Sequence, residues 1–169
     1  MKKNTTRALA WGLSLLLLLQ MLVGCTGRPY HAELYDLAAE WIREDFAAEH
    51  PVRDWGNSEE ADPHPKSRVF LVKDREQYEA IFREDADGVR VDFNSQMLVV
   101  YTFSTVYHRE NKLTDLMLQD GVLTVTYRME TPNKLFGVGV GDTSQPYQRW
   151  FVVKLDRLEV DTVIFEEEK

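Results

Sequence analysis

Two segments of alternating hydrophobic and polar residues meet at Asp120-Gly121, and together they predict a β-hairpin. Asp-Gly is typical of the two-residue type I′ turn, in which both central residues adopt positive φ. Such a turn sets three pairs of residues opposite one another: Leu118 with Leu123, Leu116 with Val125, and Thr114 with Tyr127. The apolar side chains of both segments then share one face, so the turn chemistry and the alternation agree on one register.

A helix and a buried strand are predicted before the hairpin. The spacing of three apolar residues is that of the buried stripe of a helix, at Tyr78, Ile81 and Phe82. Asp74 is suited to cap this helix, and Gln77 to reach back toward the preceding backbone as in a capping box. The segment from Met97 to Phe103 is apolar on both faces, which predicts a central strand that is covered from both sides.

Nearer the N-terminus, the pattern predicts an amphipathic helix over roughly residues 31–49. Apolar residues recur there at i, i+3, i+4, i+7 and i+8, at Leu34, Leu37, Ala38, Trp41 and Ile42. His50-Pro51 ends the helix, because the residue before a proline is pushed out of the helical region. Residues up to 67 then form a surface connection rich in proline and charge. We therefore separate an N-terminal helix and loop, 31–67, from a domain over 68–165.

In the C-terminal third of the chain, the residue pattern predicts an irregular segment followed by two strands. Residues 131–146 hold three closely spaced glycines and two prolines. Two strands follow, over 147–155 and 158–165, joined around Asp156-Arg157, and 166–169 is a short polar tail. The expected fold is α+β, an antiparallel meander-like sheet with one internal helix, preceded by the N-terminal amphipathic helix.

Residues 1–24 have the pattern of an export signal. Lys2, Lys3 and Arg7 precede an uncharged run from Ala8 to Val23 that contains five consecutive leucines. This run is short for a bilayer-spanning helix, which needs roughly 20 apolar residues. A cleaved signal peptide is therefore favoured over a permanent transmembrane anchor.

The run ends in Leu22-Val23-Gly24-Cys25, which resembles the lipobox of bacterial lipoproteins. That resemblance implies cleavage before Cys25 and diacylation of its thiol, with 25–30 as a lipidated linker. Cys25 is the only cysteine, so the exported domain has no internal disulfide and no nucleophilic or metal-binding thiol. The expected location is extracytoplasmic, on the bacterial cell membrane, because two acyl chains give stable anchoring.

The net negative charge of the exported part limits the classes of partner that it can bind. Loss of residues 1–24 removes Lys2, Lys3 and Arg7 and no acidic residue, which changes the net charge from −8 to −11. Phosphate groups and anionic lipid headgroups repel such a surface. We therefore expect no nucleic-acid partner.

The sequence holds no clear pattern for catalysis, a metal or a cofactor. Gly137, Gly139 and Gly141 are not followed by a helix that would bind phosphate, so a loop between strands is favoured. The stretch Asp85-Ala86-Asp87-Gly88 has part of a calcium-loop pattern, but Arg83 falls at the first ligand position. The histidines, at positions 31, 50, 64 and 108, lack the i, i+4 spacing of a helical metal site, and no serine lies in a G-x-S-x-G motif. We expect that the protein is not an enzyme.

Aromatic residues suggest a contact site near the ends of two strands. The candidates follow the central strand or flank the glycine-containing loop, and they are Tyr101, Tyr107, His108, Tyr147 and Trp150. Strands favour aromatic residues for packing alone, so most of these rings are expected in the core. The alternative is an aromatic contact surface, or a ligand pocket over which residues 131–146 close.

Residues 68–165 resemble the C-terminal domain of the PrcB protease-complex subunit family of bacterial exported lipoproteins. Six segments carry the resemblance through their order and spacing: Phe70-Leu71-Val72, Val91-Asp92-Phe93, Met97-Leu98-Val99-Val100, Gly121-Val122-Leu123-Thr124-Val125, Ser144-Gln145-Pro146-Tyr147 and Val152-Val153-Lys154. One departure is the loop from Ser104 to Glu110, where the family usually has a glycine-rich stretch.

The resemblance implies a non-catalytic accessory module that contacts another exported or membrane-surface protein, such as a protease. The alternative is a lipoprotein that binds a small ligand, a peptide or a saccharide, between its aromatic side chains.

The anchor gives the first testable prediction. A Cys25→Ser variant should accumulate as uncleaved precursor, because the thiol that receives the lipid is missing. Mass spectrometry of the purified N-terminus should find an acylated Cys25 in the unaltered protein. A mature chain that begins elsewhere without acyl groups, or that keeps Met1, would contradict the anchor.

Overall fold

The computed structural model describes residues 30–36, 39–84, 89–131 and 142–168. These residues form two sheets, two α-helices and a short 3-10 helix. The elements are β1 (Ala32–Tyr35), η2 (Ala39–Trp41), α2 (Glu44–Glu49), β2 (Ser67–Val72), α3 (Arg75–Ile81), β3 (Gln96–Thr105), β4 (Glu110–Gln119), β5 (Val122–Glu130), β6 (Tyr147–Asp156) and β7 (Thr162–Glu167).

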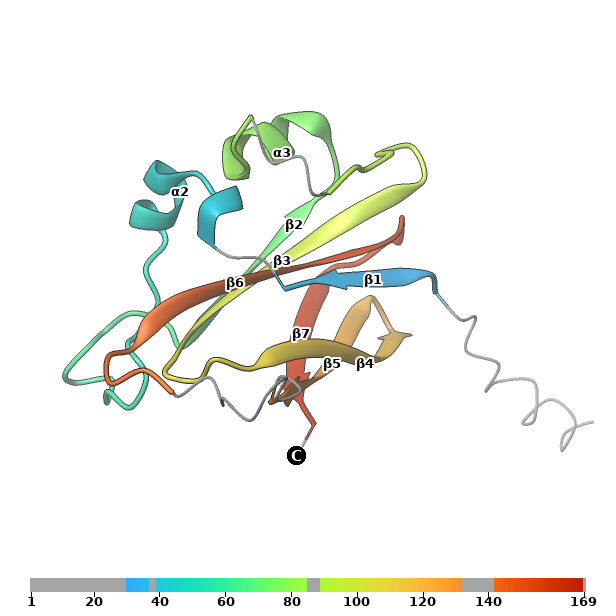
Figure 1. The fold of residues 1–169 in the computed structure, drawn as a ribbon. Coiled ribbons are helices and arrows are strands. Elements are labelled where there is room, and N and C mark those ends of the chain that lie inside the picture. The colour runs from blue at the N-terminus through green and yellow to red at the C-terminus, as the bar shows by residue number, and fades with distance from the viewer. Residues whose placement is uncertain (1–29, 37–38, 85–88, 132–141, 169) are drawn as a thin grey trace, which may run out of the picture.

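The elements are stacked in three layers (Figure 1). The first sheet has the strand order β1-β6-β3-β2, and each of its pairs is antiparallel. The helices α2 and α3 cover one face of this sheet, and the second sheet, of order β4-β5-β7, covers the other. The coarse prediction of an α+β fold is therefore confirmed, in a chain whose described residues are mainly β.

The predicted meander is wrong. In a meander, strands that follow one another in the chain pair with one another. Here β3 pairs with β6 and not with β4, and β5 pairs with β7 and not with β6, because β4, β5 and β7 form a separate sheet. The strands β6 and β7 do not pair around Asp156-Arg157 either. Arg157 donates its backbone N–H to the Ser95 carbonyl, and the chain then crosses to the second sheet, where β7 runs parallel to β5.

The predicted helix over residues 31–49 is wrong at its start, where β1 forms, and α2 occupies only its last turns. The free edge of β6 pairs with the whole of β1, from Ala32 with Leu155 to Tyr35 with Val152. This tertiary pairing outweighs a local helical pattern. The predicted stripe residues Leu37 and Ala38 lie outside the described residues.

A second contact secures β1. The ammonium group of Lys154 lies 2.8 Å from the Glu33 carboxylate and 2.9 Å from the Tyr35 hydroxyl. The hydrogen bond from Lys154 lowers the pKa of Glu33, and the same bond raises the pKa of Lys154. Both side chains therefore stay charged across the neutral range.

The internal helix is confirmed as α3, with Asp74 as its N-cap. The Asp74 carboxylate accepts the Gln77 backbone N–H at 2.8 Å, and the Gln77 side chain accepts the Lys73 N–H at 2.7 Å. Gln77 thus reaches back one residue farther than a capping box requires. Tyr78 and Ile81 of the helix and the following Phe82 are buried as expected.

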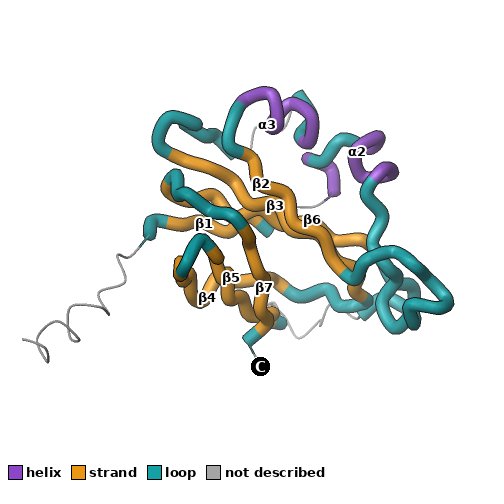
Figure 2. Tube along the Cα trace, turned by 180° about the vertical axis from the view of Figure 1, so that it is seen from behind, coloured by secondary structure: helices purple, strands orange, loops and turns teal. Residues whose placement is uncertain are grey.

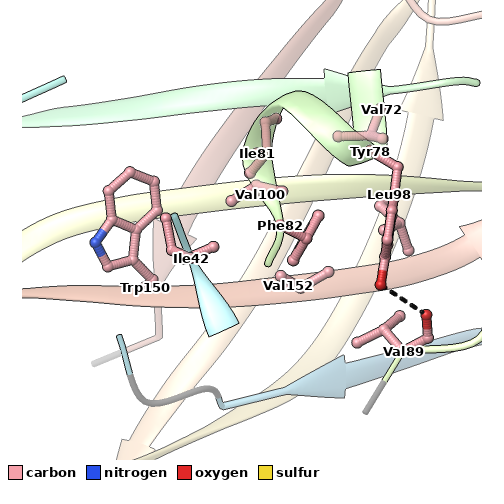
Figure 3. Close-up of a cluster of buried hydrophobic side chains, with 10 residues drawn as sticks. All are labelled: Ile42, Val72, Tyr78, Ile81, Phe82, Val89, Leu98, Val100, Trp150 and Val152. Atoms are coloured by element: carbon pink, nitrogen blue, oxygen red, sulfur yellow. Dashed lines mark hydrogen bonds between the residues drawn. The ribbon is translucent and has the colours of Figure 1, made fainter. Parts of the chain in front are cut away.

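The central strand β3 is covered on both faces, as predicted. Leu98 and Val100 point into a core beneath the helices, together with Trp150 and Val152 of β6 (Figure 3). Successive side chains of a strand point to opposite faces, so Val99 lies in a second core between the sheets. Burial of such a side chain stabilises the fold by about 1.5–3 kcal/mol, so these strands contribute strongly.

The hairpin is confirmed at Asp120-Gly121, whose φ angles are 51° and 77°. Two of the three predicted pairs form, Leu118 with Leu123 and Leu116 with Val125. The third is wrong, because the register shifts between Leu113 and Asp115 and sets Leu113, in place of Thr114, opposite Tyr127. A bulge adds one residue to one strand, which a count from the turn cannot foresee.

Replacing Gly121 with valine should destabilise the domain. A Cβ at this position would lie 2.5 Å from the Asp161 carboxylate, and the positive φ disfavours a β-branched residue even after that side chain moves away. The melting temperature should fall by roughly 2–8 °C for each kcal/mol lost. Gly121→Asn is the control, because asparagine tolerates positive φ, and it should cost less. An unchanged melting temperature for Gly121→Val would contradict the assigned turn.

Candidate functional site

Three of the five predicted aromatic contact residues come together, and two do not. Tyr107, His108 and Tyr147 meet where β3 ends and β6 begins. Tyr101 is buried between the sheets, where its ring lies 4.2 Å from that of Phe165. Trp150 is 1% exposed beneath the helices (Figure 3). Tyr101 and Trp150 therefore lie on opposite faces of the first sheet and cannot line one pocket.

Tyr147 links the three rings at the surface. Its hydroxyl donates a hydrogen bond of 2.9 Å to the Tyr107 carbonyl. Its ring stacks on His108 with a centroid distance of 5.2 Å, and His108 Nδ1 lies 3.4 Å from the Tyr147 hydroxyl. These contacts fix the loop after β3 against the start of β6.

Trp55 joins this group from the long loop between α2 and β2. Its ring meets the Tyr107 ring edge to face at 5.7 Å, and its backbone N–H donates to the Ser104 hydroxyl at 2.9 Å. The indole nevertheless remains 49% exposed, which is unusual for so large an apolar side chain. We call Trp55, Tyr107, His108 and Tyr147 the aromatic cluster.

The Trp55 loop is held in shape by Asp62. The Asp62 carboxylate accepts the backbone N–H of Asp54 at 2.9 Å and that of His64 at 3.1 Å. These hydrogen bonds, led by that from Asp54, lower the pKa of Asp62. At neutral pH the carboxylate is therefore ionised and keeps the loop closed.

Arg109 adds a positive charge beside the aromatic cluster. Its guanidinium carbon lies 4.4 Å from the centre of the Tyr107 ring, within cation–π distance. No described carboxylate forms an ion pair with it. Stacking orients the guanidinium while its hydrogen-bond donors stay available to a partner.

An ion pair beneath the aromatic cluster joins the two sheets. Asp36, directly after β1, accepts two hydrogen bonds from Arg149 of β6, of 2.5 and 3.2 Å. It also accepts the backbone N–H of Asn111 of β4 at 3.0 Å and the Asn111 side-chain amide at 2.9 Å. Arg149 in turn donates to the Tyr107 carbonyl at 3.4 Å. One carboxylate thus connects β1, β4 and β6 below Tyr107.

Sequence patterns do not identify these supporting residues. Trp55 lies in a loop with no periodicity, and Asp36 lies within the segment that the helical pattern covers. Arg109 belongs to the loop that departs from the family pattern. Trp55 alone gives a weak signal. A tryptophan in a segment rich in proline and charge belongs to no predicted helix or strand that would bury it, so it is a candidate for an exposed contact residue.

Other predicted features lie outside the described residues: the export signal with Cys25, the stretch Asp85-Ala86-Asp87-Gly88, and most of the glycine-containing loop, from 132 to 141. The described end of that loop is tied to the aromatic cluster's neighbour Val106. Thr143 donates its backbone N–H to the Val106 carbonyl at 2.8 Å.

The described residues contain no group of three or more histidine, cysteine or acidic side chains placed to hold a metal. A separate depression of about 750 Å³ lies beside α2 and α3, lined by Arg43, Glu44, Asp45, Arg83 and Glu84. Its lining mixes basic and acidic side chains, and hydrogen bonds from Arg43 lower the pKa of Asp45 to about 2. Because positive and negative side chains lie side by side in this depression, their charges largely offset one another and give little attraction for a charged ligand. The aromatic cluster is therefore the better candidate site.

Comparisons with known protein families, with curated proteins and with solved structures found no match to this chain. The resemblance to the PrcB family stays a prediction from the sequence.

The ion pair beneath the aromatic cluster gives a stability prediction. Asp36→Ala should lower the free energy of unfolding by about 1–3 kcal/mol, because Arg149, whose side chain is 14% exposed, loses its charged partner. Urea unfolding measures this. The double variant Asp36→Leu/Arg149→Met should recover part of the loss, since no unpaired charge remains.

Glu79→Ala is the control, because it removes an exposed ion pair with Arg75. Such an exposed pair is screened by solvent and contributes little to stability. If Asp36→Ala destabilises no more than Glu79→Ala, the ion pair does not support the aromatic cluster.

Proposed function

We propose that this protein is a lipid-anchored extracytoplasmic interaction module whose aromatic cluster contacts another exported or membrane-surface protein. The observation that carries the proposal is Trp55, half exposed and held by its own backbone and by Tyr107. Tryptophan, tyrosine and arginine dominate the binding energy of protein interfaces. The aromatic cluster with Arg109 combines all three.

Rigidity favours this use of the aromatic cluster. Side chains that are already ordered lose less conformational entropy when a partner binds. Asp62 shapes the Trp55 loop, the Tyr147 hydroxyl binds the Tyr107 carbonyl, and Tyr107 orients Arg109. A partner would therefore meet a preformed surface.

The lipid anchor rests on the N-terminal sequence, with cleavage before Cys25 and acylation of its thiol. No helix among the described residues is long and apolar enough to cross a bilayer. The net charge of −11 after cleavage opposes binding to nucleic acid and leaves a protein as the favoured partner. The resemblance to the PrcB family makes a protease complex the first partner to test.

A small-ligand lipoprotein is the weaker alternative. The pocket envisaged for a peptide or saccharide needs Tyr101 and Trp150 beside Tyr107 and Tyr147. Because the first two are buried on opposite faces of the sheet, only part of that lining is available. The half-exposed indole and the stacked guanidinium fit a protein contact better.

Crosslinking in intact cells, followed by mass spectrometry, tests the proposal. Trp55→Ala should reduce the yield of crosslinked partner several-fold and leave the melting temperature nearly unchanged, because the indole is half exposed. Met117→Ala is the matched control, since Met117 is a large apolar residue that is 51% exposed on the second sheet. Equal loss in both variants, or no exported partner for the unaltered protein, would contradict the proposal.

A further inference from the structure

The chain enters the fold at one end of the first sheet. His31 donates its backbone N–H to the Asp156 carboxylate at 3.2 Å, and its carbonyl accepts the Asp156 N–H at 3.2 Å. Ala32 then pairs with Leu155, which pairs with Met97 on its other side. These bonds fix the point at which a tether from Cys25 reaches the domain.

The aromatic cluster lies at the opposite end of the same sheet. Leu155 lies opposite Met97 at the entry end, and Tyr147 lies opposite Thr105 at the other end of this strand pair. Eight residue steps of about 3.3 Å separate Leu155 from Tyr147 along β6, a distance of about 26 Å. In both views the start of β1 and the loop that carries Trp55 lie at opposite ends of the molecule (Figures 1 and 2).

The tether is shorter than the sheet. Five residue steps join Cys25 to Tyr30, and a fully extended chain spans at most about 3.6 Å per step, which gives about 18 Å. With Cys25 at the bilayer surface, the entry end must stay within that distance. The tether does not hold the aromatic cluster within this distance of the bilayer, because the cluster lies at the other end of the sheet.

Charge determines which pose the tether favours. Anionic headgroups repel a domain of net charge −11, and the repulsion falls off over about 8–10 Å at physiological salt. A pose lying on its side brings exposed carboxylates from both ends of the domain within this range, Asp156 and Glu159 at the entry end and Glu59 and Glu60 in the Trp55 loop. An upright pose keeps only the entry-end carboxylates near the lipid and moves those of the Trp55 loop beyond this range.

We propose that the domain stands on its entry end, so that the aromatic cluster faces away from the membrane. This inference rests on the proposed lipidation of Cys25. The partner then meets the aromatic cluster in the aqueous space beyond the bilayer surface. The occupant that fits is a water-exposed domain of an exported protein, which presents apolar side chains to Trp55 and a carboxylate to Arg109.

Two single-cysteine variants of the full lipidated protein test this pose. Lipidation consumes the thiol of Cys25, so an introduced cysteine is the one available to a fluorescent label. Glu159→Cys labels the connection between β6 and β7 at the entry end, and Glu60→Cys labels the Trp55 loop. Both positions are exposed and both changes remove one negative charge, so the variants are matched.

The labelled proteins are inserted into vesicles of phosphatidylcholine with phosphatidylglycerol that carry an acceptor dye on their headgroups. Energy transfer to the dye should be several-fold lower from position 60 than from position 159. The difference should shrink at high salt or in pure phosphatidylcholine, because screening or loss of headgroup charge removes the repulsion. Equal transfer from both positions, or stronger transfer from position 60, would overturn the upright pose.

Vesicle flotation separates this inference from its premise. Protein that floats with the vesicles, carries acylated Cys25 and gives equal transfer disproves the pose and leaves the anchor intact. Protein that does not float and lacks acyl groups disproves the anchor, and the pose with it.

Discussion

The structure depends on the burial of both faces of β3 and β6. Trp150 and Val152 of β6 enter the core beneath the helices, and Phe151 and Val153 enter the core between the sheets. A shift of one residue between β3 and β6 would move every side chain of one strand to the wrong core. This constraint fixes the register of the first sheet and, through it, the place where Tyr147 and the end of β3 meet.

The aromatic cluster is a consequence of that register. Because β6 begins where β3 ends, Tyr147 reaches the loop that holds Tyr107 and His108. Asp36 extends the same arrangement to the second sheet through Arg149 and Asn111. The Asn111 amide donates to Asp36, whereas its side-chain oxygen is buried with no hydrogen-bond partner among the described residues, which costs solvation free energy.

Local rules predicted the elements whose cause is local. Asp74 caps α3, Asp120-Gly121 forms its turn, and the apolar run around Val99 becomes the central strand. The segment of β1 has an apolar spacing that fits the period of a helix as well as that of a strand, and so it was predicted as helix. Only its pairing with the free edge of β6 decides for a strand.

The site was predicted only in part for the same reason. Tyr107, His108 and Tyr147 are near strand ends in the sequence, so their proximity follows once β3 and β6 pair. The loop that brings Trp55 to Tyr107 and the ion pair of Asp36 with Arg149 join distant segments, and one sequence holds no signal for such contacts. Tyr101 and Trp150 were predicted as contact residues but are buried in the two cores. Aromatic residue type alone does not distinguish a core ring from a surface ring.

We expect the two-sided burial of β3 and β6 to unite both sheets in one cooperative unit. Native-state hydrogen exchange measures this most directly, because it gives the free energy of opening for each amide. The amides of Val99 in β3 and Val125 in β5 should exchange with the same free energy, equal to that of global unfolding. Exchange at Val125 with a much smaller free energy than at Val99 would mean that the second sheet opens alone and that β3 and β6 do not unite the two sheets.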